Sequence, residues 1–244
     1  MSIPLEKFST VFHFYLACFL LGFSSLVAQI ILFREMMVAF YGNELCLGVL
    51  LSVWLFWVGI GSYLGNRIAR RGNYSSIKLS FWYALISIAT LVTIVSTRFS
   101  KQILGTAPAE IVGFLPMFIF SFAVMSFLCL VLGITFILNS KSWIWDETHV
   151  FRVNRVYLWE SLGAGAGGFL VTFVLIPIFS NFEIAILLFS LNLIFCALPL
   201  TQNLNVIKKL LLWAFVILVV FGFSLSNLGG KLDSYSSAKE WKGL

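Results

Sequence analysis

The feature of this chain that most restricts its fold is a series of seven stretches, each close to 20 residues long, in which charged side chains are almost absent. A helix needs about 20 apolar residues to cross the hydrocarbon core of a bilayer. The stretches are Val11–Phe33, Leu45–Asn66, Leu79–Thr97, Ile111–Leu138, Val156–Phe179, Ile184–Leu200 and Leu210–Leu228. We therefore predict an all-α fold, a polytopic transmembrane helical bundle with about seven spans.

The composition also indicates an integral membrane protein. Hydrophobic residues make up 60% of the chain and charged residues 11%, and the mean hydropathy is +1.00. A soluble domain carries charge on roughly a quarter of its residues, so a soluble fold is excluded. The formal net charge of +6 is expected to face lipid headgroups, because no basic stretch alternates with polar residues suited to reading bases. The expected partner is the lipid bilayer, and no nucleic acid is expected.

Lysine and arginine residues in the loops predict an orientation. If the spans alternate in direction, one side of the membrane holds ten of these residues and the other side six. The richer side normally faces the cytoplasm. We therefore predict a multi-pass protein of the inner (cytoplasmic) membrane, with its N-terminus in the cytoplasm and its C-terminus outside. Residues 1–227 form the predicted transmembrane domain, and residues 228–244 form a soluble linker or tail.

Cysteine and histidine residues offer little for a metal or cofactor site. The four cysteines all lie within or at the end of apolar stretches and form no Cys-x-x-Cys motif: Cys18, Cys46, Cys129 and Cys196. We expect free, packed thiols and no cofactor or metal. His13 and His149 could ligate a b-type haem only if both rings reached one depth on facing helices. We instead expect one interfacial and one loop histidine.

Three charged residues bracket the turn between the first two stretches. Arg34 and Glu35 lie near the end of the first predicted helix, and Glu44 begins the second. Adjacent residues on a helix point about 100° apart, so Arg34 and Glu35 face each other poorly, and Glu44 is the better partner for Arg34. This intramembrane charge cluster is interpreted as a clamp that closes the hairpin, with a substrate or proton site, or side chains that simply snorkel to the interface, as the alternatives.

Glu160 is the only acid inside a predicted span. Counting along the helix, Gly163, Ala164, Gly167 and Gly168 lie on the same stripe as this carboxylate. Gly163 and Gly167 form a G-x-x-x-G pair, which lets a second helix approach closely, so Glu160 should face protein and not lipid. A buried carboxylate needs a hydrogen bond, a cation or a proton. Two readings stay open: packing with a satisfied hydrogen bond, or a proton or ligand role.

Gly61 and Gly65 form a second pair with helix-packing spacing, followed by a basic turn. This segment loosely resembles the loop between helices two and three of major facilitator transporters. The acid that usually precedes the arginine in that loop is Asn66 here.

Four motifs together resemble the membrane region of spermidine synthase-like membrane proteins, including the fused major-facilitator–spermidine-synthase proteins. They lie at Gln29–Glu35, Gly42–Leu45, Gly59–Gly65 and Tyr157–Ala164. In that family a block of helices precedes a soluble aminopropyltransferase-type domain, and Leu232–Leu244 resembles the lead-in to it. The catalytic part implied by the resemblance is absent from these residues, so we expect no aminopropyl transfer by them and no catalytic residue.

Three hypotheses for the function follow. The favoured one is a non-catalytic membrane subunit or anchor domain that scaffolds a soluble partner or domain. The second is a small-solute or polyamine transporter that uses Glu160 and the Arg34, Glu35 and Glu44 cluster. The third is a membrane subunit of an electron-transfer complex.

Overall fold

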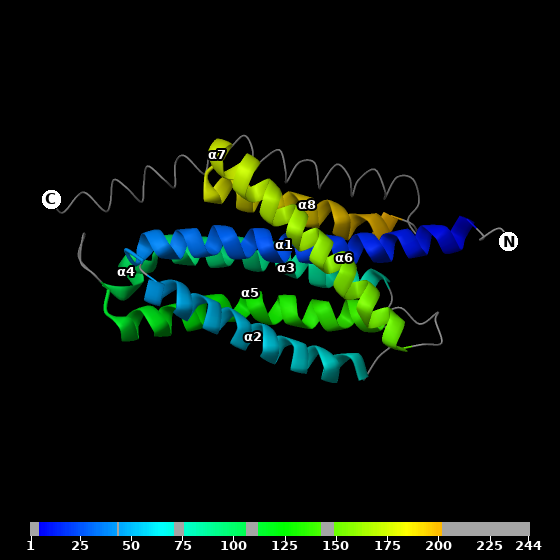
Figure 1. Cartoon of the computed structure of the whole chain (residues 1–244), viewed down its shortest axis with the longest axis horizontal. Coiled ribbons are helices and arrows are strands. Elements are labelled where there is room, and N and C mark those ends of the chain that lie inside the picture. The colour runs from blue at the N-terminus through cyan, green and yellow to red at the C-terminus, as the bar shows by residue number, and fades with distance from the viewer. Residues whose placement is uncertain (1–4, 43, 71–75, 106–111, 143–148, 202–244) are drawn as a thin grey trace.

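The computed structural model describes the backbone of residues 5–42, 44–70, 76–105, 112–142 and 149–201 (Figure 1). Every regular element in these ranges is helical, and they contain no strand, so the predicted all-α fold is confirmed. In chain order the elements are α1 (Leu5–Ala39), α2 (Glu44–Arg70), α3 (Ser76–Arg98), α4 (Ser100–Leu104), α5 (Phe114–Ser142), α6 (His149–Leu170), the π-helical turn η1 (Val171–Leu175), α7 (Ile176–Ile178) and α8 (Asn181–Thr201).

Five segments are long and apolar enough to cross a membrane, and they match the first five predicted stretches. They are Phe12–Ala39, Glu44–Arg70, Leu79–Arg98, Phe114–Lys141 and Asn154–Ile178. The sixth stretch forms the shorter apolar helix Asn181–Ala197. The seventh stretch, Leu210–Leu228, and the predicted tail lie outside the described residues. The structure thus supports a helical membrane protein, with five candidate spans where about seven were predicted.

The helices alternate in direction, as a polytopic chain with short connections requires. Helix α1 packs parallel to α6, and α2 packs parallel to α5. In both pairs, the residue numbers of the contacting positions increase together along the two helices. For example, Gly61 and Gly65 of α2 face Leu130 and Ile134 of α5 in turn. Helix α1 lies within the bundle and contacts α2, α3, α5, α6 and α8 (Figure 1).

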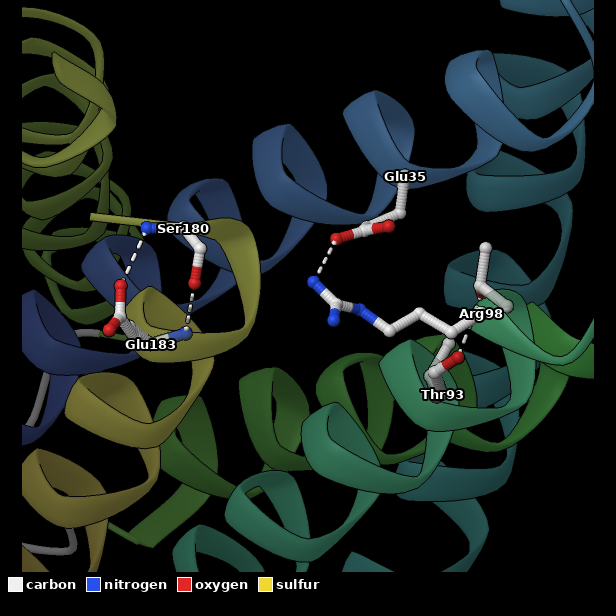
Figure 2. Close-up of polar contacts among 6 residues, drawn as sticks. Glu35, Thr93, Arg98, Ser180 and Glu183 are labelled. Atoms are coloured by element: carbon white, nitrogen blue, oxygen red, sulfur yellow. Dashed lines mark hydrogen bonds and ion pairs between the residues drawn. The ribbon is translucent and has the colours of Figure 1, made fainter. Parts of the chain in front are cut away.

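Helix ends follow local sequence signals. After α1 the chain turns through Tyr41, whose φ of 50° is left-handed, and the Gly42 N–H donates to the Met37 carbonyl at 2.8 Å. Helix α8 begins with a capping box: the Ser180 N–H donates to the Glu183 carboxylate at 2.8 Å, and the Glu183 N–H donates to the Ser180 hydroxyl at 3.3 Å (Figure 2). Two donors at this helix end are therefore satisfied.

Glycines provide the close approach between paired helices. An added Cβ at Gly163 would overlap the Phe19 carbonyl oxygen of α1, and one at Gly167 would lie 3.0 Å from the Phe23 carbonyl oxygen. On the other pair, a Cβ at Gly61 would lie 2.5 Å from the Leu130 carbonyl oxygen. Without a hydrophobic driving force between helices in lipid, such backbone proximity supplies the packing contacts that hold a bundle together.

Candidate functional site

Buried polar contacts hold four helices in one arrangement. The Tyr83 hydroxyl of α3 donates to the Ala17 carbonyl of α1 at 2.5 Å and accepts from the Asn139 amide of α5 at 2.9 Å. The Ser24 hydroxyl of α1 donates to Asn192 of α8 at 3.0 Å. Polar groups in a bilayer interior must be satisfied by the protein, so these bonds define how α1, α3, α5 and α8 pack. Sequence reasoning missed them, because Ser, Tyr and Asn inside apolar stretches gave no spacing signal.

One end of the bundle carries a nearly buried ion pair. Arg98 at the end of α3 donates to the Glu35 carboxylate of α1 at 3.0 Å, and the two side chains are 10% and 13% exposed (Figure 2). The Arg98 guanidinium also lies 5.4 Å from the ring centre of Phe182, in the first turn of α8. The pair therefore joins α1, α3 and α8 where these helices end. We call this the ion-pair end.

The predicted Arg34, Glu35 and Glu44 cluster is assembled differently. Arg34 and Glu44 are exposed, and no ion pair joins them in the part of the chain that the structure describes. Glu35 instead pairs with Arg98, which sequence reasoning treated only as a loop charge. Arg98 directly follows the third stretch, on the same predicted side as Glu35, but the rotation of the helices decides which cation reaches the carboxylate. The expected Arg34–Glu44 partnership is therefore replaced by Glu35–Arg98.

The opposite end carries basic side chains, and we call it the basic end. Arg155 of α6 donates to the Tyr15 hydroxyl of α1 at 3.1 Å. Lys141 of α5 donates to the side-chain oxygen of Asn66 on α2. Asn66, which stands where the transporter loop motif usually has an acid, thus serves as a neutral acceptor for a cation on a neighbouring helix.

Between the two parallel helix pairs lies a cavity of about 240 Å³ that contains Glu160. Helices α1, α2, α5 and α6 all contribute to its wall, which consists of Leu21, Ser25, Trp54, Val58, Ser62, Leu132, Phe136, Tyr157 and Glu160. The wall therefore combines one carboxylate, three aromatic rings and two aliphatic hydroxyl groups. The predicted stripe explains this position: Gly163 and Gly167 hold α6 against α1, and Glu160 lies half-buried at the edge of that contact.

Glu160 lies inside a candidate span, six residues after the start of Asn154–Ile178. Its backbone carbonyl is directly beside Gly22, ten residues after the start of the candidate span Phe12–Ala39. Six and ten helical residues correspond to about 9 and 15 Å along the helix axis, so Glu160 lies between the ends of both candidate spans and nearer the basic end. Within the described residues the carboxylate has neither a hydrogen bond nor an ion pair. The described residues thus show no hydrogen bond for the packing interpretation, and the proton or ligand role stays a prediction.

The remaining predicted residues do not form a second site in the described part of the chain. His13 is half-buried on α1, with its ring 6.3 Å from that of Phe12, whereas His149 begins α6 and its side chain lies outside the described residues. The four cysteines, all within the described residues, are buried and form no disulfide. Over the described ranges, no group of three or more His, Cys, Asp or Glu residues could hold a metal ion.

No family model, no curated protein and no solved structure matches this chain.

Proposed function

We propose that this chain is a small-solute transporter of the membrane and that Glu160 binds the solute. The observation that carries the proposal is a carboxylate at membrane depth that lines a cavity between four helices and lacks a protein partner in the described ranges. Ionisable groups inside a membrane are rare and mark substrate or ion pathways when they face a cavity. A purely structural acid would be expected to hold a hydrogen bond or a cation.

The size of the cavity suits a small solute. An apolar cavity of about 150 Å³ can hold benzene, which has six non-hydrogen atoms. The cavity at Glu160 has a volume of about 240 Å³, so it has room for a somewhat larger molecule. The polar groups on its wall are few and converge from different helices, which is typical of ligand sites.

The two ends of the bundle support alternating access to this cavity. The cavity lies nearer the basic end, whereas the Glu35–Arg98 pair and Phe182 join three helices at the other end. Transport requires that the closed end open while the other closes, and ion pairs between helix ends can break and re-form as helices rock. We propose that Glu35 and Arg98 close the pathway at the ion-pair end.

Several basic residues of the described helices gather at one end of the bundle. Arg67, Arg70, Lys141 and Arg155 all lie at the basic end, and this charge distribution supports placing that end in the cytoplasm. We propose the inner membrane as the location, with the N-terminus in the cytoplasm.

Uptake by purified protein in liposomes tests the transport proposal. Four labelled solutes that cross lipid poorly serve as probes: choline, alanine, glucose and succinate. We expect one of them to accumulate by counterflow above protein-free liposomes, and Glu160→Gln to reduce that rate at least about tenfold, because the variant removes the charge that binds the solute. Glu44→Gln, at an exposed acid of α2, is the matched control and should transport normally. Full uptake by Glu160→Gln, or no uptake of any probe, would contradict the proposal.

A non-catalytic membrane subunit or anchor domain of the spermidine synthase-like type remains the second candidate. It is favoured by the outer face of the candidate span Asn154–Ile178, which comprises most of α6 together with η1 and α7 and is the least buried of the five, at 17%. On that face Gly165 is open, between exposed Leu162 and Phe169. A glycine on an exposed helix face has no side chain, so another transmembrane helix can approach closely there. A native mass above 27.4 kDa with a stoichiometric partner, together with absent uptake, would favour this candidate over the transporter.

A further inference from the structure

The charges on the cavity wall discriminate between classes of solute. Among the lining residues there is one acid, Glu160, and no lysine, arginine or histidine. At membrane depth an ionised carboxylate without a countercharge is strongly disfavoured. A bound anion would add a second negative charge, and a neutral solute would leave the first uncompensated. Among these three classes of solute, only a cation compensates the charge of an ionised Glu160 and is attracted by it.

Aromatic rings on the wall favour an organic cation over a metal ion. Trp54, Phe136 and Tyr157 come from three different helices and all line the same cavity as the carboxylate. The ring faces of such residues attract ammonium groups; Trp54 is buried, whereas Tyr157 is 56% exposed. Phe136 and Tyr157 pack edge to face, with ring centres 5.4 Å apart, so their orientations are coupled. Hard metal ions instead need several oxygen ligands, and the wall offers one carboxylate and three hydroxyl groups spread over three helices.

The number of acids also limits the charge of the ligand. A polyamine such as spermidine carries three positive charges, and a single carboxylate compensates one of them. The other two would be buried at membrane depth without a partner among the lining residues, at several kcal/mol for each ion. A compact cation with a single charge avoids this penalty and fits a volume of about 240 Å³.

We propose that the cavity at Glu160 binds monovalent organic cations, with the ammonium group held by the Glu160 carboxylate and the apolar groups held by Trp54, Phe136 and Tyr157. This inference rests on the proposed transport function but names its substrate class, and it excludes the polyamine as the best ligand.

Equilibrium binding to the full chain in lipid nanodiscs tests the inference without requiring transport. The probes share one shape and differ in charge: choline, its uncharged carbon analogue 3,3-dimethylbutan-1-ol, and the anion 3,3-dimethylbutanoate. Spermidine is the fourth probe. We expect choline to bind at least about tenfold more tightly than each of the others, a difference of about 1.4 kcal/mol in binding free energy. Equal or tighter binding of the alcohol, the anion or spermidine, or no choline binding at millimolar concentration, would overturn the inference.

Variants distinguish the loss of one binding group, the carboxylate or a ring, from general damage to the fold. Glu160→Gln should lose choline binding, whereas Glu160→Asp, which keeps the charge, should retain part of it, and both must show the melting temperature of the parent protein. Tyr157→Phe keeps the ring and should bind within about threefold of the parent, whereas Tyr157→Leu should bind clearly more weakly. Unchanged choline affinity in Glu160→Gln would refute the assignment of the site.

The binding and uptake experiments fail in different ways. Choline binding that depends on Glu160, without uptake of any probe, would leave the ligand class intact and reject the transporter. Uptake of glucose or succinate that depends on Glu160 would leave the transporter intact and reject the ligand class.

Discussion

At the scale of single residues, the partner of a charge determines its role. Glu35 and Glu160 both lie on candidate spans, but Glu35 pairs with Arg98, whereas Glu160 has no partner within the described residues. This difference is the reason why closing the bundle is proposed for Glu35 and solute binding is proposed for Glu160. This distinction depends on side-chain geometry and is absent from the spacing of the residues in sequence.

The Glu35–Arg98 pair should contribute measurably to stability. Neutralising one partner, in Glu35→Gln or Arg98→Gln, should destabilise the protein by about 3 kcal/mol, because it leaves the other charge nearly buried and unpaired. A double-mutant cycle measured by unfolding in mixed micelles should give a coupling energy of at least about 1 kcal/mol. Glu44→Gln, at an exposed position, should change stability little. If the effects of the two substitutions on the free energy of unfolding are additive, the coupling energy is zero and the pair does not stabilise this end of the bundle.

At the scale of helices, paired glycines determine which helices touch. The stripes at Gly61 and Gly65 on α2 and at Gly163 and Gly167 on α6 each face the backbone of one neighbouring helix. These two seams make two helix pairs, and the cavity lies between the pairs and not within either. The glycines therefore shape the site without lining it.

Substitutions two residues apart on α6 test this role. Gly163→Ala should destabilise the protein by about 1–3 kcal/mol, because its methyl group would overlap the Phe19 carbonyl and force α1 and α6 apart. Gly165→Ala is the matched control: it meets open space and should be neutral or slightly stabilising, since alanine favours a helix more than glycine does. Thermal unfolding of the two variants measures the difference. If both variants unfold at the same temperature, the α1–α6 seam is not packed as described.

At the scale of the whole molecule, alternating helices gather described charges at two ends, with Glu160 between them. The basic end carries Arg67, Arg70, Lys141 and Arg155, whereas acids at the other end accompany Arg34 and Arg98. The cavity lies between these ends, nearer the first.

The proposed orientation predicts which end of the bundle a membrane-impermeant reagent can label from outside the cell. The four native cysteines are buried, so a single introduced cysteine should dominate labelling. With a membrane-impermeant maleimide on intact cells, Tyr41→Cys at the ion-pair end should be labelled, and Arg70→Cys at the basic end should be labelled only after the membrane is opened. Labelling of Arg70→Cys alone in intact cells would reverse the orientation.

The sequence by itself determined the fold class and the first five candidate spans, because uncharged segments of bilayer length have few alternatives to a transmembrane helix. It also singled out Glu160 and the two glycine pairs, since these follow from the helical period within one segment. Tertiary structure alone decided that Glu35 pairs with Arg98 and that Trp54, Phe136 and Tyr157 meet Glu160 in one cavity. Those contacts join separate helices, and their relative rotation and depth arise from packing, which no period within a single span encodes.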